Sequence, residues 1–336
     1  MPLSSTKFAP GFDKQSTSYG AEGKWIDGEN VRFRYGQPEK IGGWTKLTSD
    51  KLIGAVRDQF AWSALDGTRH LALGTDKKLY LYVEGAIADI TPVRATQANL
   101  TNPFVTTSGS PIVTVTDAGH GAGVGDFVTF SGAAALGGNF TAEVLNLEYE
   151  VLSVEDENTY TILAKSFSNT TLTFTNVAST SSDSGSGGTS TVGAYQINVG
   201  VTTASDLAGW GAGSYGAGLF GVGETSQEEL RIWSQQNFGE DLIFGLRGGR
   251  IYYWDASTSL TTRAVDLTTR SGASNVPTVQ NSILVSDINR FVFCFGANIL
   301  GSATQDPMLI RWSDQEDATN WTPSATTQAG SLRLSR

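Results

Sequence analysis

Three acids and two tryptophans near the C-terminus are the residues in this sequence best spaced to do chemistry. The run "RWSDQEDATNWTP" places Asp314, Glu316 and Asp317 between Trp312 and Trp321. These carboxylates could bind Ca²⁺ or act as acids and bases, but they lack the full ligand spacing of a calcium loop. Asp and Asn side chains also bond to nearby backbone amides, which favours turns. We therefore predict a structural corner, with Asp314 in its turn and both tryptophans packed over it.

Other motifs with possible chemistry are weaker. "GAGSYG" (211–216) matches a dinucleotide-binding glycine pattern, but the sequence indicates neither a strand before it nor a helix after it. His70, His120 and Cys294 are the chain's two histidines and its one cysteine, too few for a zinc site within the chain. The sequence thus predicts no catalytic residue, no cofactor and no bound metal. A paired-carboxylate glycosidase stays open, because spatial pairing of acids is invisible in a sequence.

Charge and composition narrow the class of protein. The 336 residues carry a formal charge of −10, whereas a protein that reads nucleic-acid sequence needs a basic face. Residues 97–197 hold nine acids and one lysine, a net of −8, which suggests a separate module. The single cysteine fits assembly in a reducing cytosol. No apolar run is long enough for a signal peptide or a transmembrane helix, so no stable membrane insertion is expected.

Strand signals recur along the chain, and helical periodicity is nearly absent. Three similar stretches each contain an apolar strand, a turn with glycine, an aromatic strand and an acidic corner. The aromatic strands are Leu79–Tyr82, Ile251–Trp254 and Leu309–Trp312. This imperfect repeat predicts an all-β fold of β-propeller-like blades, with a β-sandwich as the alternative.

The same signals predict four parts. Residues 1–23 form a polar N-terminal arm, and 24–96 form the first propeller-like unit. Residues 97–197 are an inserted acidic β domain, a small barrel or sandwich, with a flexible Ser/Gly loop at 179–191. Residues 198–336 form the further propeller-like units.

Several stretches resemble one known family. These are "FAPGFDKQSTSYGAEGKWIDGENVRFRYGQPEKIGGW", "GWGAGSYGAG", "LRIWSQQNFGEDLIF", "GGRIYYWD" and "IRWSDQEDATNWTP". They are similar to motifs of tail nozzle or hub proteins of short-tailed bacteriophages, of the tail tubular or packaged-DNA-stabilisation type. The resemblance covers residues 8–94 and 197–336. Residues 101–164 resemble a second recurring phage-tail module, a small β domain.

The resemblance implies a structural virion protein rather than an enzyme. Such proteins assemble as a homo-oligomeric ring, expected to be hexameric, at the distal end of the tail tube. Its partners would be tail adaptor or tube proteins and fibre or spike proteins. Double-stranded DNA would pass through without sequence recognition, and assembly would occur in the bacterial cytoplasm. Family members are longer, so either this chain is a shortened product or another chain or neighbouring subunits close its propeller.

Aromatic residues are the candidate structural and interface positions. Phe8, Phe12 and Tyr19 are predicted to anchor the N-terminal arm in a neighbouring subunit. The remaining candidates, with Asp314, are Trp25, Trp44, Trp254, Trp312 and Trp321.

An alternative function is a host-surface propeller that binds or cleaves glycans. Trp210, Tyr215, Trp233 and Trp254 would then stack on sugars, whereas core and interface packing is the simpler role for such rings.

Overall fold

The computed structural model describes residues 8–43, 45–168, 173–200 and 230–335. The fold is all-β, as the sequence predicts, and the chain forms two compact units, Met1–Ser49 and Asp50–Arg336. Among the described residues, the one α-helix is the four-residue α1 (Ala142–Leu145), and the 3-10 helix η1 spans Leu267–Thr269. Within those same ranges, no helix has the length and apolar character to cross a bilayer.

The first unit consists of two small strand pairs. Strand β1 (Ala9–Phe12) runs parallel to β2 (Lys24–Trp25). Strand β3 (Val31–Arg34) forms an antiparallel hairpin with β4 (Gln37–Lys40). Tyr35 lies in the turn between them, with a φ of 51° in the left-handed region. The boundary predicted at residue 23 therefore falls inside this unit.

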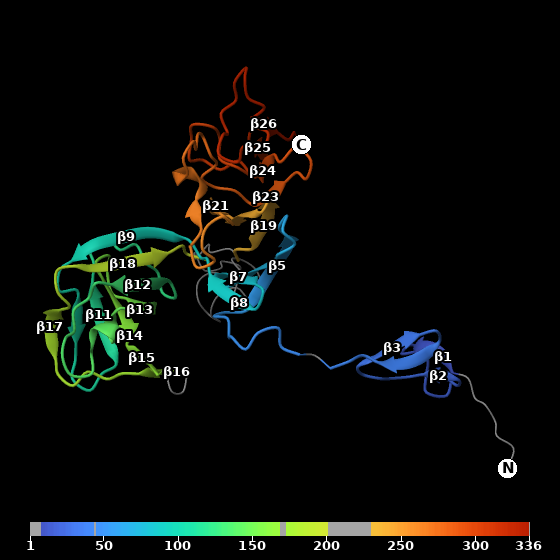
Figure 1. Cartoon of the computed structure of the whole chain (residues 1–336), viewed down its shortest axis with the longest axis horizontal. Coiled ribbons are helices and arrows are strands. Elements are labelled where there is room, and N and C mark those ends of the chain that lie inside the picture. Colours follow the sequence, from blue (N-terminus) through green and yellow to red (C-terminus); the bar gives the residue numbers. More distant parts are fainter. Residues whose placement is uncertain (1–7, 44, 169–172, 201–229, 336) are drawn as a thin grey trace, which may run out of the picture. The chain divides into compact units, whose positions relative to one another are not determined.

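The second unit contains three four-stranded antiparallel sheets, each with its strands in chain order (Figure 1). The first sheet contains β5 (Val56–Ser63), β6 (Arg69–Thr75), β7 (Leu79–Val83) and β8 (Ala86–Asp89). The second contains β19 (Trp233–Phe238), β20 (Asp241–Leu246), β21 (Ile251–Trp254) and β22 (Val265–Asp266). The third contains β23 (Ser282–Val285), β24 (Val292–Phe295), β25 (Leu309–Trp312) and β26 (Gly330–Arg333). In each sheet the aromatic strand expected from the sequence is the third strand.

The three sheets meet through their first strands, as the blades of a propeller do. Strand β19 contacts both β5 and β23 (Figure 1). Gln235 Nε2 donates to Asp58 Oδ2 at 2.9 Å across the first of these contacts. Across the second, Ser234 Oγ accepts from the backbone N–H of Ile283 at 3.1 Å. Apolar side chains fill the space between neighbouring sheets, with one core cluster between the first and second sheets and another between the second and third.

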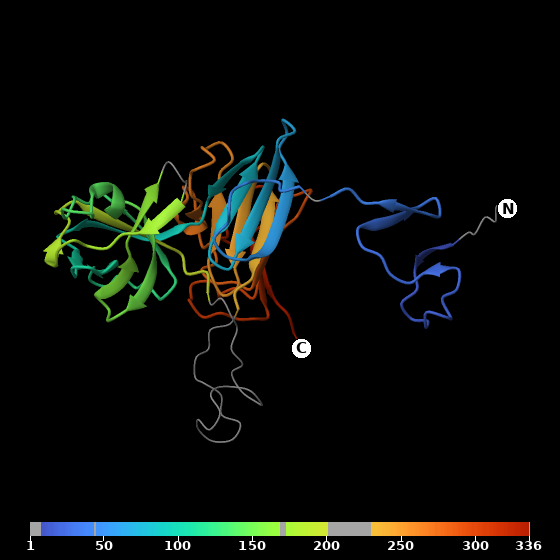
Figure 2. The same cartoon turned by 90° about the horizontal axis from the view of Figure 1, so that it is seen from below.

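The inserted β domain is a single sheet of eight strands, in the order β17-β10-β11-β14-β13-β12-β18-β9. Figure 2 shows that this sheet is curled. These strands are β9 (Val93–Leu100), β10 (Phe104–Thr106), β11 (Ile112–Thr116), β12 (Phe127–Ser131), β13 (Glu148–Val154), β14 (Thr159–Leu163), β17 (Asp183–Ser186) and β18 (Thr191–Gln196). A separate hairpin joins β15 (Lys165–Ser168) to β16 (Thr173–Asn176). The curl encloses an apolar core of its own.

Two features of this domain differ from the sequence-based expectation. Its sheet starts at Val93, before the predicted boundary at residue 97, because the entering strand β9 pairs with the leaving strand β18. The predicted flexible loop at 179–191 contains β17, which pairs with β10. The backbone N–H of Gly109 donates to the carbonyl of Ser179 at 2.8 Å, so contacts distant in sequence order this Ser/Gly segment.

Candidate functional site

The two tryptophans of the C-terminal corner have different surroundings. Trp321 is 1% exposed in the core between the second and third sheets, and its Nε1 donates to the carbonyl of Ala318 at 2.8 Å. Trp312 is half-buried, and its ring lies 6.3 Å from that of Phe293. Trp312 is therefore not a core residue, and its Nε1 donates to the carbonyl of Gln328 at 2.7 Å. The packing of both rings over the corner stays a prediction. Successive side chains of β25 point to opposite faces of the sheet, so the neighbouring residue Arg311 is buried and Trp312 is not.

The carboxylates of this corner bond to the backbone of the turn. Asp314 Oδ1 accepts from the backbone N–H groups of Gln315 at 2.9 Å and Gln328 at 2.7 Å. Asp317 Oδ1 accepts from the N–H of Thr319 at 2.8 Å. Within the described ranges, no group of three His, Cys, Asp or Glu side chains is placed to hold a metal ion. These hydrogen bonds between carboxylates and backbone N–H groups fix the conformation of the turn.

Trp254 and Trp233 are core residues between the first and second sheets. Trp254 is buried, and its Nε1 donates to the carbonyl of Thr262 at 3.2 Å. Trp233 is also buried, and its Nε1 donates to the carbonyl of Thr75 at 2.6 Å. A Cβ at Gly74 would come within 2.5 Å of the Trp233 ring, so glycine permits this packing. Neither ring presents a free face for a sugar.

The aromatic residues of the first unit form a small cluster of their own. Phe8 lies 5.3 Å from Trp25, and Phe12 lies 5.2 Å from Phe33, measured between ring centroids. Tyr19 is almost fully exposed. Phe8 and Phe12 thus contact rings of their own unit, and Tyr19 is the predicted anchor that stays free for another surface. Trp44, Trp210 and Tyr215, together with the "GAGSYG" motif, lie outside the described residues.

The histidines and the cysteine are buried and separate. His70 stacks on Trp62 in the first sheet at 5.0 Å, and His120 lies in the inserted domain, where its Nδ1 accepts from the N–H of Ala122 at 2.9 Å. Burial raises the pKa of the Cys294 thiol to about 12, so this group is neutral and inert at physiological pH.

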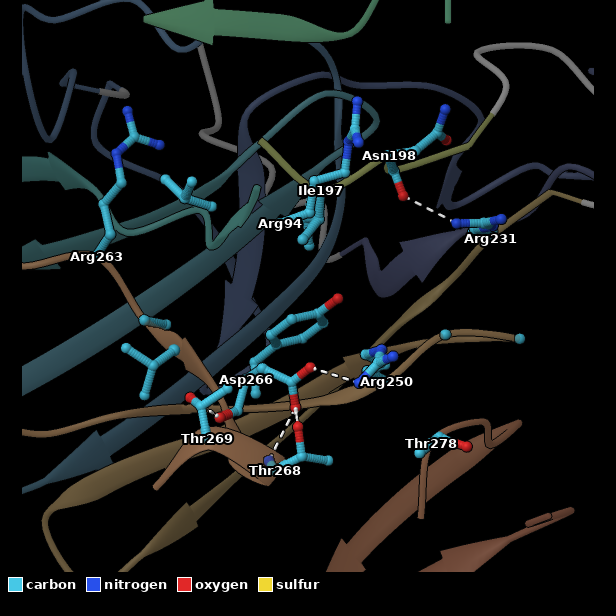
Figure 3. A pocket seen from close by; sticks show the side chains of 16 residues that line it. Arg94, Ile197, Asn198, Arg231, Arg250, Arg263, Asp266, Thr268, Thr269 and Thr278 are labelled. Atoms are coloured by element: carbon cyan, nitrogen blue, oxygen red, sulfur yellow. Dashed lines mark hydrogen bonds and ion pairs between the residues drawn. The ribbon is translucent and has the colours of Figure 1, made fainter. Parts of the chain in front are cut away.

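A cleft that the sequence did not reveal lies between the inserted domain and the second sheet. It has a volume of about 800 Å³, and four arginines line it, namely Arg94, Arg231, Arg250 and Arg263 (Figure 3). Among the described lining residues Asp266 is the one acid, so these residues have a net formal charge of +3. We call this the arginine cleft. It contrasts with the chain's overall charge of −10.

The arginines come from four different segments, and their partners differ. Arg250 Nη1 pairs with Asp266 Oδ2 at 3.0 Å. Arg94 donates to the carbonyl of His120 at 2.9 Å, and Arg231 donates to the carbonyl of Asn198 at 2.9 Å. Among the described residues, no carboxylate pairs with Arg94 or Arg231. The arrangement can therefore bind an anion through guanidinium groups.

Arg263 also belongs to a partly buried cluster of charges that joins the inserted domain to the first two sheets. Lys78 Nζ lies 2.7 Å from Asp89 Oδ2 and 2.6 Å from Glu148 Oε2. Arg263 Nη2 lies 3.3 Å from Asp89 Oδ2 and 3.2 Å from Glu148 Oε1. We call these four residues the ionic junction. Part of the negative charge noticed in residues 97–197 therefore faces cations of the propeller-like sheets.

No local sequence pattern indicates either feature. The arginines are scattered from residue 94 to residue 263, and only the pairing of sheets brings them together. The sequence shows the acidic bias of the inserted domain, but it does not show that Lys78 and Arg263 pair with one of these acids.

Comparisons with known proteins assign this chain to no family. The sequence matches no protein-family model, and no curated protein is similar to it. A solved structure of a phage phi92 endosialidase aligns with 84% of this chain at 17% identity and a TM-score of 0.24. The chain spans 36% of that protein's length. A similarity this low carries no argument about function.

Proposed function

We propose that this chain is a structural virion protein of a bacteriophage tail, a nozzle or hub protein that assembles as a ring around the path of the ejected DNA. The proposal rests on where the residues that resemble tail proteins lie in the fold. "GGRIYYWD" supplies the turn before β21 and the strand itself, and "IRWSDQEDATNWTP" supplies β25 from Ile310 onward and the corner after it. The residues that resemble tail proteins thus build repeated sheets and turns.

An apolar outer face on the third sheet supports assembly with further subunits or tail proteins. Leu284 pairs with Phe293, which pairs with Trp312, so these side chains lie in one row. Ile310 and Leu332 form a neighbouring row on the same face. Leu284 and Leu332 are exposed, and Phe293, Ile310 and Trp312 are half-buried. A blade of a propeller normally packs on such a face, and a neighbouring protein could do the same.

Sedimentation velocity and low-resolution electron microscopy test this proposal. The full chain is expected to form rings, and a chain lacking residues 1–20 is expected to assemble more weakly. Leu332→Ser should also weaken assembly, whereas Ile288→Ser, an 88% exposed position on the turn after β23, should not. A monodisperse monomer for every variant, with no recruitment to tails, would contradict the proposal. Release of reducing ends from host polysaccharide would favour the glycan-cleaving alternative instead.

A further inference from the structure

We propose that the arginine cleft binds a short, extended, acidic peptide segment of a partner protein. The cleft lies at the meeting of β9 and β22, and its cationic lining stands out in an acidic chain. The inference goes beyond the proposed tail function, because it concerns a binding chemistry that the isolated chain would show in any biological setting.

The cationic donors of the cleft are only partly used. Within the described part of the chain, Arg94 and Arg231 each donate one bond to a backbone carbonyl, and a guanidinium has five N–H donors. Most of their donors therefore remain for a ligand. Figure 3 shows Arg94 and Arg231 on one side of the cleft and Asp266 with Arg250 on the other. A carboxylate suits these positions, because its two oxygens match the planar fork of a guanidinium.

A hydroxyl adds a neutral donor to the cleft. Tyr252 lines the cleft, and burial, reinforced by the nearby charge of Asp266, raises the pKa of its phenol to about 12. The phenol therefore keeps its proton at neutral pH and can donate to an acceptor oxygen.

Two sheet edges border the cleft, and edges recognise extended peptides. Strand β9 is the last strand of the eight-stranded sheet, and β22 is the last strand of the second sheet. Val93 and Arg94 of β9 and Val265 and Asp266 of β22 all line the cleft. An extended segment can pair its backbone with such an edge while its side chains reach the arginines.

The same lining disfavours nucleic acids and acidic saccharides. Bases and sugars are commonly held on aromatic faces, but Tyr252, the aromatic residue of the lining, is only 7% exposed. A long polyanion would also meet the negative charge of the rest of the chain. A short segment senses mainly the local arginines, because screening limits charge effects to about 8 Å at physiological salt.

Fluorescence anisotropy with labelled hexaglutamate tests the proposal on the full chain at low salt. Binding should weaken at least about tenfold in the double variant Arg94→Gln/Arg231→Gln and on raising the salt. Arg69→Gln, an exposed arginine of β6 outside the cleft, is the matched control and should bind as the native chain does. Asp266→Asn removes the acid of the lining, so it should bind several-fold more tightly.

Competition identifies the class of ligand. Hexaglutamine should not bind, and a short DNA duplex or a sulfated oligosaccharide should compete more weakly than unlabelled hexaglutamate. Equal binding by the double variant and Arg69→Gln, or no binding at all, would overturn the site. Stronger competition by DNA or by the saccharide through the same arginines would overturn the peptide assignment. Thermal unfolding of each variant shows that lost binding is not lost folding. Ring assembly is read separately by sedimentation, so the two proposals can fail independently.

Discussion

Two interfaces inside the second unit differ in chemistry, because one consists of apolar side chains and the other of charged side chains. The seam between the second and third sheets is apolar and includes Ile243, Ile283 and the fully buried Trp321. The ionic junction between the inserted domain and the sheets instead places Lys78, which is 1% exposed, against two carboxylates. Apolar contacts are non-directional and depend on the area removed from water. Charged groups gain from burial only when the geometry satisfies each of them.

The difference suggests that the two interfaces have different roles. The apolar seam supplies stability to a repeated stack, and the ionic junction fixes the orientation of a domain that has a separate core. A buried ionic cluster is costly to dehydrate, so its net contribution to stability is small even when breaking it is destabilising.

The largest effect is expected at the apolar seam. Trp321→Ala should lower the free energy of unfolding by about 3–5 kcal/mol, because it leaves a cavity in a closed core. Trp312→Ala is the matched control, since that ring is half-buried on the outer face and should cost clearly less. Urea unfolding measures both. Equal losses for the two variants would show that the difference in burial does not control stability here.

A smaller effect is expected at the ionic junction. Glu148→Gln should cost about 2–3 kcal/mol, below the range for enclosed ion pairs because 25% of this side chain stays exposed. The variant leaves Lys78 with Asp89 as its one carboxylate partner in the junction. Glu150→Gln, which removes the more exposed pair with Lys77, should cost less than about 1 kcal/mol. Hydrogen exchange should show the Glu148→Gln loss at β8 and β13 and not in the third sheet.

Acid should weaken the ionic junction before it affects the apolar seam. Burial alone would raise the pKa of Asp89, but the charges of Lys78 and Arg263 outweigh burial and hold that pKa below its usual value of 3.8. Its contribution to stability is therefore complete above that value and is lost as the pH falls through the lowered pKa. Urea unfolding at a series of pH values should show this loss, and Asp89→Asn should make the dependence shallower. An unchanged slope would argue against this role for Asp89.

The sequence predicted the repeated strands because their signal is local. Ile251–Trp254 and Leu309–Trp312 read as strands from side-chain type and flanking turns alone, and the structure places both as third strands. Local composition misled at 179–191, where Ser and Gly indicated a loop but β10 supplies a partner for β17. Lys78 follows Lys77 in a polar turn, and nothing in the sequence distinguishes the buried lysine from the more exposed one. The arginine cleft likewise depends on distant segments meeting.

The pairing of β9 with β18 has a consequence for the history of this chain. Ala95 lies opposite Tyr195, so the host chain enters and leaves the inserted domain at neighbouring points. A single recombination event could add or remove the domain while leaving the path of the host backbone nearly unchanged. The exchange would not be neutral, however. An inserted domain without an acid in the place of Glu148 would leave Lys78 and Arg263 with too little negative charge. A chain that lacked the inserted domain is therefore expected to have carried a different residue at position 78.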